Sequence, residues 1–124
     1  MARITLIPLF SGQSLSAGDS STSNKIDLRY AANNGMFALA FSNAAGTSTT
    51  CGTTVFTYSG CSVEGGTYVT PSSADAIGTS GPTIGGDIKT FEPELMAFMK
   101  IIATQTGAGT AGANSKITAE LLMQ

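Results

Sequence analysis

The chain has 124 residues, enough for one domain with a single core. Charged residues make up only 11%, against roughly 25% in an average soluble domain, whereas serine and threonine together number 31. The net charge of −2 and the six scattered basic residues exclude a phosphate-binding stripe for nucleic acid, and no apolar run is long enough to span a membrane. A hydroxyl-rich surface indicates contact with other protein copies or, equally, a β-rich chain that favours threonine.

The N-terminal residues 1–10 combine one cation with an apolar run that Pro8 interrupts. Because proline cannot donate to a ladder, this run predicts an edge strand or, equally, an arm that pairs with a neighbouring subunit. The residues of this possible intersubunit arm are Arg3, Ile4, Leu6, Ile7, Leu9 and Phe10. The run lacks the length and the cleavage site of an export signal, so we expect the protein to be made and kept in a cytosol.

A polar stretch follows over residues 11–24, with Leu15 as its one large apolar residue. This stretch predicts a flexible loop, and loops of that length are usually functional or disordered. We therefore expect two parts in the chain. Residues 1–24 would form an N-terminal arm and flexible loop, and residues 25–124 a β-sandwich domain.

Two strands joined by a tight turn are predicted next. Residues 25–30 alternate, with Ile26 and Leu28 on one face, while Asp27 and Arg29 on the other predict a cross-strand or intersubunit ion pair. Asn-Gly at positions 34 and 35 is a strong hairpin signal, so we expect residues 36–43 to pair with residues 25–30.

The second of these strands has one large-residue face and one small-residue face. The two faces are Phe37, Leu39 and Phe41 against Met36, Ala38 and Ala40. The small residues would let a partner sheet or subunit approach closely. Further strands are expected over residues 47–58, 67–70 and 87–91, with an irregular link between the last two.

The two cysteines, Cys51 and Cys61, lie ten positions apart. A pair of that separation could face each other across a tight loop and form a disulfide. The alternative is two small buried thiols, which synthesis in a cytosol favours. Both possibilities remain open from the sequence.

The C-terminal residues 91–124 contain two apolar runs separated by a polar, glycine-rich gap. Each run alternates with the period of a half-buried strand. In the first run one face carries Met99, Ile101 and Ala103, and in the second run one face carries Ile117, Ala119, Leu121 and Met123. We predict a long hairpin with its tip between Thr106 and Ser115, and at most one short helical turn between Pro93 and Lys100. The whole pattern predicts an all-β fold, an antiparallel β-sandwich or jelly roll of about seven or eight strands.

The sequence offers little for catalysis. It has no histidine, which removes the commonest general base and the usual zinc ligand together. We assign no catalytic, cofactor-binding or metal-binding residue and expect no enzyme. Four acids could converge as a calcium site or a hydrolase pair, although solvated loop acids are the simpler interpretation; these acids are Asp75, Asp87, Glu92 and Glu94.

Five aromatic residues fall at core spacing, and a sugar-binding platform is the alternative interpretation. These residues are Tyr30, Phe37, Phe41, Phe56 and Tyr58. The absence of tryptophan weakens the sugar-binding alternative.

Five segments carry a family resemblance. They are Ile-Asp-Leu at residues 26–28, Gly-Met-Phe-Ala-Leu at 35–39, Phe-Thr-Tyr-Ser at 56–59, Gly-Gly-Thr-Tyr-Val-Thr-Pro at 65–71, and Phe-Glu-Pro-Glu-Leu-Met-Ala-Phe-Met-Lys at 91–100. In this order they resemble the small β-sandwich structural proteins of tailed bacteriophage virions. Residues 3–24 have no counterpart in that pattern, and no binding residue can be transferred from it.

The resemblance implies a non-enzymatic virion structural protein, assembled in the host cytoplasm. It would be a capsid decoration or accessory protein that stabilises the head, forms a homo-oligomer and docks on the major capsid protein or other virion proteins. A neck or tail subunit and a carbohydrate- or cell-binding β-sandwich module are the alternatives. A carboxylate-dependent hydrolase and an exported surface-layer or pilus subunit are further rivals.

Overall fold

The structure is a computed structural model that describes residues 4–16, 18–29, 37–45, 52–72, 76–80, 85–94, 96–106 and 114–124. Within these ranges the chain forms nine strands and no helix. The strands are β1 (Thr5–Ser16), β2 (Ser20–Thr22), β3 (Ile26–Asp27), β4 (Phe37–Ala45), β5 (Thr53–Cys61), β6 (Gly78–Ser80), β7 (Gly85–Phe91), β8 (Phe98–Thr106) and β9 (Asn114–Met123). The prediction of an all-β fold is confirmed.

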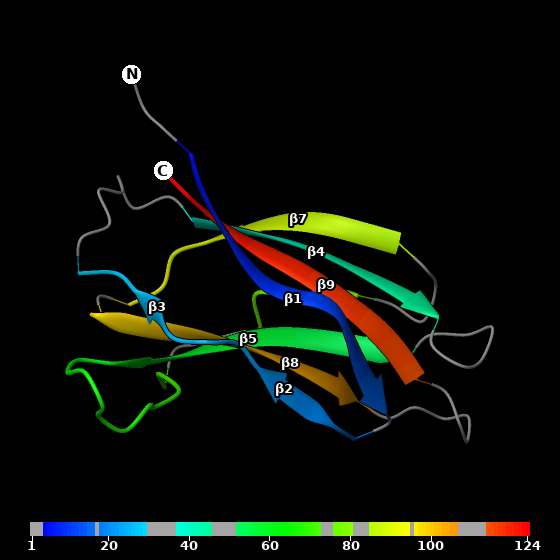
Figure 1. Ribbon diagram of the computed structural model, residues 1–124, viewed down its shortest axis with the longest axis horizontal. Helices are drawn as coiled ribbons and strands as arrows, with labels where there is room; N and C mark the ends of the chain where they lie inside the picture. The colour runs from blue at the N-terminus through cyan, green and yellow to red at the C-terminus, as the bar shows by residue number, and fades with distance from the viewer. Residues whose placement is uncertain are drawn as a thin grey trace.

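The strands form two antiparallel sheets that pack face to face (Figure 1). The first sheet has the order β1-β9-β4-β7, and the second has the order β2-β8-β5-β6, with β3 also paired to β8. Figure 1 shows the first sheet above the second. The predicted β-sandwich is therefore confirmed.

The core lies between the two sheets and is built by alternation of side chains along each strand. Its central buried residues are Leu39 and Phe41 of β4, Phe56 and Tyr58 of β5, Met99, Ile101 and Ala103 of β8, and Ile117, Ala119 and Leu121 of β9. The rings of Phe41 and Phe56 meet across the gap, with centroids 4.6 Å apart. Each fully buried large apolar side chain contributes about 1.5–3 kcal/mol of hydrophobic stabilisation.

The two C-terminal strands lie in different sheets, so the predicted hairpin of residues 91–124 is wrong. β8 pairs with β5, from Thr53↔Thr106 to Cys61↔Phe98, whereas β9 lies between β1 and β4. Both strands have one apolar face, and these faces are buried against each other as opposing layers. Alternation shows which face of a strand is buried and leaves its neighbour in the sheet undetermined.

The predicted pairing of residues 25–30 with residues 36–43 is also wrong. β3 contributes Ile26 and Asp27 to the second sheet, opposite Met99 and Phe98 of β8, while β4 pairs with β7 and β9 in the first sheet. The Asn-Gly turn on which that prediction rested lies outside the described residues.

The N-terminal segment belongs to the sandwich. β1 pairs with β9 over most of its length, and Phe10 and Leu15 are buried in the core. The loop predicted over residues 11–24 is therefore wrong at residues 11–16, which belong to β1, and at Ser20–Thr22. β1 and β2 belong to the two sheets and do not form a separate arm. The sequence does not reveal a strand over residues 11–16, because nearly all of these residues are exposed and Leu15 is the one buried apolar residue among them.

β1 lies at one end of the first sheet, which confirms the prediction of an edge strand. Its register with β9 shifts between Pro8 and Phe10 and again between Phe10 and Gln13. Gly12 has a φ of 63°, a left-handed conformation that suits glycine, and its N–H donates to Thr118 Oγ1 at 3.1 Å. β1 is therefore an irregular, bulged edge.

Two short elements of the second sheet differ from the prediction. Residues 67–70 form only an isolated bridge, Gly60↔Val69, and Gly78–Ser80 forms β6 beside β5 inside the expected irregular link. A strand of two or three residues is too short to show a periodicity in the sequence. Its neighbours in the sheet decide whether it forms. The described residues between Pro93 and Lys100 contain no helical turn.

Candidate docking surface

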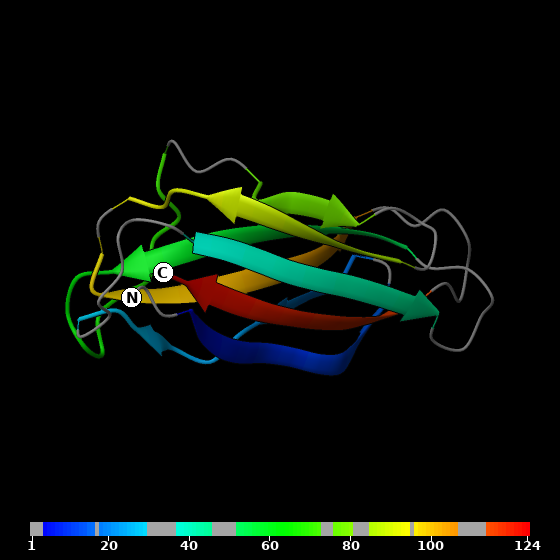
Figure 2. The same cartoon turned by 90° about the horizontal axis from the view of Figure 1, so that it is seen from above.

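The first sheet faces the viewer in Figure 2. Its outward side chains form a surface that we name the outer face. Directly opposed residues of antiparallel strands share one face. Ala40 opposes Glu120 and Ile88, and Ala38 opposes Leu122 and Thr90. All six residues point outward, because the intervening residues of β4 are buried in the core.

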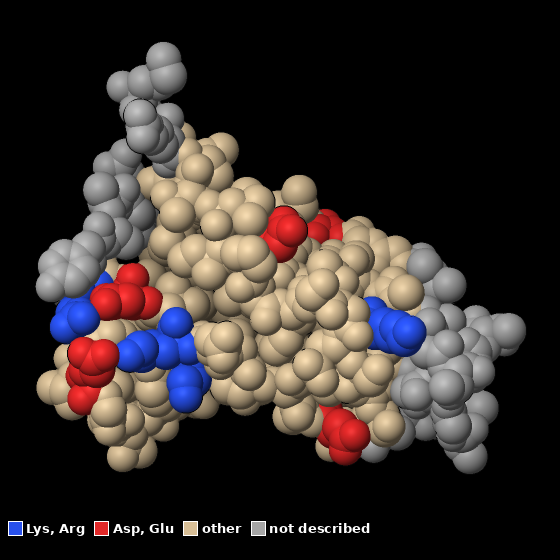
Figure 3. Space-filling model, viewed as in Figure 1, with Lys and Arg blue, Asp and Glu red and all other residues tan. Residues whose placement is uncertain are grey.

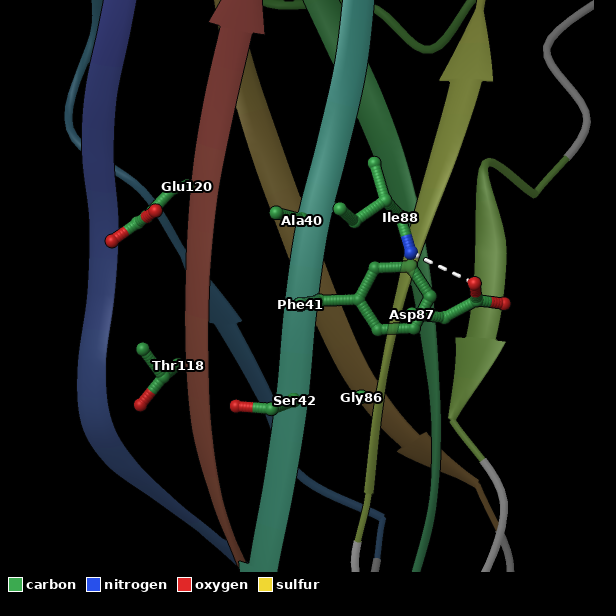
Figure 4. A pocket seen from close by; sticks show the side chains of 8 residues that line it. All are labelled: Ala40, Phe41, Ser42, Gly86, Asp87, Ile88, Thr118 and Glu120. Atoms are coloured by element: carbon green, nitrogen blue, oxygen red, sulfur yellow. Dashed lines mark hydrogen bonds between the residues drawn. The ribbon is translucent and has the colours of Figure 1, made fainter.

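Small residues occupy the middle of the outer face. Ala38 and Ala40 are half-buried, whereas Ser42 and Ala44 further along β4 are exposed. The sequence prediction that the small residues of this strand share one side is confirmed. A hollow of about 480 Å³ lies there, between β9, β4 and β7 (Figure 4), and its lining includes Ala40, Ser42, Gly86, Ile88, Thr118 and Glu120.

Apolar side chains flank the small residues. Ile88 of β7 is 66% exposed, Leu6 of β1 is 50% exposed, and Ile4 just before β1 is 64% exposed. A second hollow, of about 130 Å³, is lined by Ile4, Leu122 and neighbouring residues at the end of the sheet. Single exposed apolar residues are ordinary. These apolar side chains lie close together at the first sheet, and their burial against a partner would stabilise the complex.

The structure divides the residues of the predicted intersubunit arm. Arg3 lies outside the described residues, and Ile4 and Leu6 are exposed. Ile7, Leu9 and Phe10 pack against the core of their own chain. Its inward residues and its ladder with β9 hold this segment on the sandwich as an edge strand, and contact with a neighbouring subunit stays a prediction.

The outer edge of β7 is a second feature of the first sheet. Its residues from Gly85 to Thr90 are exposed, and β7 ends the order of the sheet. The backbone N–H of Ile88 donates to Asp87 Oδ1 at 2.8 Å, and Lys89 Nζ lies 3.5 Å from Asp87 Oδ2. The sequence analysis expected a strand over residues 87–91 and considered Asp87 as a calcium ligand, a hydrolase acid or a loop acid, whereas the alternation of opposite charges around Ile88 was a further signal that it did not use.

A cluster of four charged residues lies at one end of the second sheet, over β3 and the segment after β5 (Figure 3). Arg29 makes a bidentate pair with Asp27, with Nε to Oδ1 at 3.1 Å and Nη2 to Oδ2 at 2.8 Å. Lys25 Nζ lies 2.8 Å from Glu64 Oε1. Asp27 and Arg29 thus pair with each other within one segment, because side chains two apart on a strand share a face. Arg29 Nη2 also lies 3.8 Å from Glu64 Oε2 in the segment after β5.

This cluster is balanced in charge and shields an aromatic ring. The hydrogen bond from Arg29 lowers the pKa of Asp27, and the hydrogen bond from Lys25 lowers the pKa of Glu64. Lys25 Nζ and Arg29 Cζ lie 5.3 and 4.8 Å from the centre of the buried Phe98 ring. The charges of these four side chains cancel, and Lys100 lies over the neighbouring Tyr68 ring, with its Nζ 4.3 Å from the ring centre.

Two of the acids considered for chemistry, Glu94 and Asp87, have different hydrogen-bond partners. Glu94 accepts a hydrogen bond from the Tyr58 hydroxyl, and Asp87 is engaged at β7. Glu92 is exposed, and Asp75 lies outside the described residues. Among the described residues no group of three or more Cys, Asp or Glu side chains could hold a metal ion.

One of the two cysteines lies among the described residues. Cys61 ends β5 with a free, buried thiol whose Sγ lies 2.7 Å from the Val63 carbonyl oxygen. Cys51 lies outside the described residues, so the Cys51–Cys61 disulfide and its alternative of two buried thiols stay predictions.

The aromatic residues form core and not a sugar-binding platform. Phe37, Phe41, Phe56 and Tyr58 are buried, and Tyr30 lies outside the described residues. Phe91 bridges two of them, with ring centroids 5.7 Å from Phe37 and 5.8 Å from Tyr58. The core interpretation of these four residues is confirmed.

Comparison with known proteins finds no matching family model and no matching curated protein. In the part of the chain that the structure describes, there is no helix long and apolar enough to cross a membrane. The case for a function therefore depends on the chain's own surfaces.

Proposed function

We propose that this protein is a non-enzymatic structural component of a tailed-bacteriophage particle. In this proposal it is a capsid decoration protein that stabilises the head, associates with its own copies, and docks on the major capsid protein. The observation that supports it is the outer face, where small side chains of β4 are bordered by the exposed apolar residues Leu6 and Ile88. The resemblance of five sequence segments to virion β-sandwich proteins is the reason for proposing a phage particle as the place where the protein acts.

The outer face comes close in area to one side of a specific interface, and its chemistry suits docking. Four strands about 4.8 Å apart, each about nine residues long at about 3.3 Å per residue, cover roughly 570 Å². Specific interfaces use about 600–1,000 Å² per partner. Alanine and serine let another backbone come close, and Glu120 and Lys116 are the only charged residues among the described outward side chains of β4, β7 and β9. A partner would therefore desolvate few charges on this face.

Particle membership is the first test. Mass spectrometry of purified particles of the encoding phage should find the chain in many copies, and labelling of the particles should place it on the head. Labelling confined to the neck or tail would favour the alternative of a neck or tail subunit. Absence from the particles would refute the proposal.

A substitution in the hollow tests the outer face itself. Ala40→Arg puts a long charged side chain where a partner would approach, and we expect occupancy on particles to fall at least about tenfold. Thr57→Arg is the matched control, because Thr57 is a half-buried residue on the outward side of β5 in the second sheet. Equal loss with both variants would show that the outer face has no special role.

A further inference from the structure

We propose that two copies of the chain associate through their β7 strands. The strands would align antiparallel, with Ile88 opposite Ile88 of the second copy, and join two four-stranded sheets into one of eight strands. This inference rests on the self-association in the proposed function and names the surface and register through which it occurs.

The two ends of the first sheet differ in how they present an edge. β1 carries Pro8, two register shifts and a left-handed Gly12, all features that discourage another strand from adding. β7 has neither a proline nor a bulge, and its register runs without a shift from Phe37↔Phe91 to Asn43↔Gly85. β6 lies near β7, but it hydrogen-bonds to β5 in the second sheet. A regular strand edge of this kind is a template for a second strand.

The N–H of Ile88 shows which residues of β7 direct their backbone groups away from β4. This N–H donates to a side-chain oxygen of Asp87, on the side of β7 away from β4 (Figure 4). In an antiparallel ladder, the residues that direct both backbone groups to one side alternate. Gly86, Ile88 and Thr90 therefore direct their N–H and C=O groups to the edge of β7 that faces away from β4, and no other described strand pairs with that edge. A second strand must place its own outward residues opposite these three.

The charges on β7 select one register among those that these backbone directions allow. Centring the pair on Ile88 places Asp87 opposite Lys89 of the second copy, twice by symmetry. Centring it on residue 87 would oppose two aspartates, and centring it on residue 89 would oppose two lysines. Directly opposed unlike charges stabilise a strand pair, and like charges destabilise it. The sequence around Ile88 is therefore complementary to itself.

Association exchanges contacts without leaving a donor unpaired. The Ile88 N–H would move from Asp87 Oδ1 to the Ile88 carbonyl oxygen of the second copy, and the released carboxylate would face Lys89 of that copy. Asp87 and Lys89 are about half-exposed, so both can make this change without disturbing the core. Ile88, which is 66% exposed, would meet its counterpart across the new pair.

Charge reversal tests this register in solution. Sedimentation of the full chain should show a concentration-dependent dimer, and D87K or K89D alone should weaken it by about tenfold, because each variant makes two opposed pairs repulsive. An equimolar mixture of D87K and K89D should recover the dimer, since unlike charges then oppose each other again. The double variant D87K/K89D should recover it too. K116E, which reverses an exposed lysine on the outward side of β9, is the control and should leave the dimer unchanged.

A cysteine at the symmetry position gives an independent measurement. Hydrogen-bonded antiparallel residues have Cα atoms about 5.5 Å apart, within the range of a disulfide. I88C should oxidise rapidly to a covalent dimer, whereas T90C, which would lie opposite Gly86, should not. The wild-type chain, treated in the same way, is the control for disulfides formed by the native cysteines.

Several outcomes would overturn the β7 pairing: a wild-type chain that stays monomeric up to about 100 μM, a dimer unaffected by K89D, or no recovery in the mixture. A chain found on phage particles but monomeric in solution would contradict this inference and leave the proposed function standing. A chain that forms the β7 dimer in solution but is absent from particles would support this inference and contradict the proposed function.

Discussion

The charged residues of the second sheet act as a cover for an aromatic side chain. Arg29 is held by Asp27, and both Arg29 and Lys25 lie over the ring of Phe98, which is buried. The carboxylates hold the cations in place over the ring, so the pairs have a structural role. Exposed ion pairs of this kind contribute little to stability individually.

The pKa of Asp27 should respond to the loss of Arg29. In R29A we expect it to rise toward its ordinary value, because the hydrogen bonds from Arg29 are the main cause of the lowered pKa. In the wild type the carboxylate stays charged to lower pH. The contribution of the pair to stability is thus present above the ordinary pKa of aspartate and lost as pH falls through the lowered value.

NMR titration of the Asp27 carboxyl group measures this shift directly. K89A is the control, since Lys89 pairs with Asp87 on another strand. A titration of Asp27 that is the same in R29A as in the wild type would show that the guanidinium does not cause the lowered pKa.

Among the elements, β1 shows most clearly how tertiary pairing overrides a polar sequence. Its twelve residues are mostly exposed, yet Leu15 is only 2% exposed and Phe10 only 7%. The ladder with β9 satisfies the backbone of β1, and two inward side chains hold it on the core. β1 is therefore an integral strand of the sandwich.

Deleting residues 1–16 should destabilise the sandwich. Loss of two buried large side chains, at about 1.5–3 kcal/mol each, together with the β9 ladder, predicts a fall of several kcal/mol in the free energy of unfolding. Urea unfolding followed by circular dichroism measures it. Deleting residues 1–4 is the control, with an expected change within about 0.5 kcal/mol. Equal stability of the longer deletion would mean that the segment is a detachable arm after all.

The sequence predicted burial far better than it predicted pairing. Alternation separated the two faces of β4, β8 and β9 correctly, since one-sided burial imposes a period of two on a strand. It did not show that β8 and β9 lie in opposing sheets, because contacts between residues far apart in the chain decide which strands are neighbours. The small-residue side of β4 followed from the same alternation. The free edge of β7 did not, because its exposure depends on where the sheet ends.

The whole molecule is a two-layer sandwich whose surfaces differ in their suitability for contact. Charges that neutralise each other gather at one end of the second sheet, and the outer face of the first sheet carries small and apolar residues. That sheet ends in an irregular strand on one side and a regular one on the other. This arrangement gives one face for a large partner and one edge for a second copy.

Electron cryomicroscopy of purified phage particles tests the central claim, association through the first sheet, most directly. We expect density for the sandwich on the head, with the outer face around Ala40 and Ser42 covered by a capsid protein and with β7 beside β7 of a second copy. Particles without such density, or with the sandwich attached through its second sheet while the outer face is open to solvent, would contradict the account.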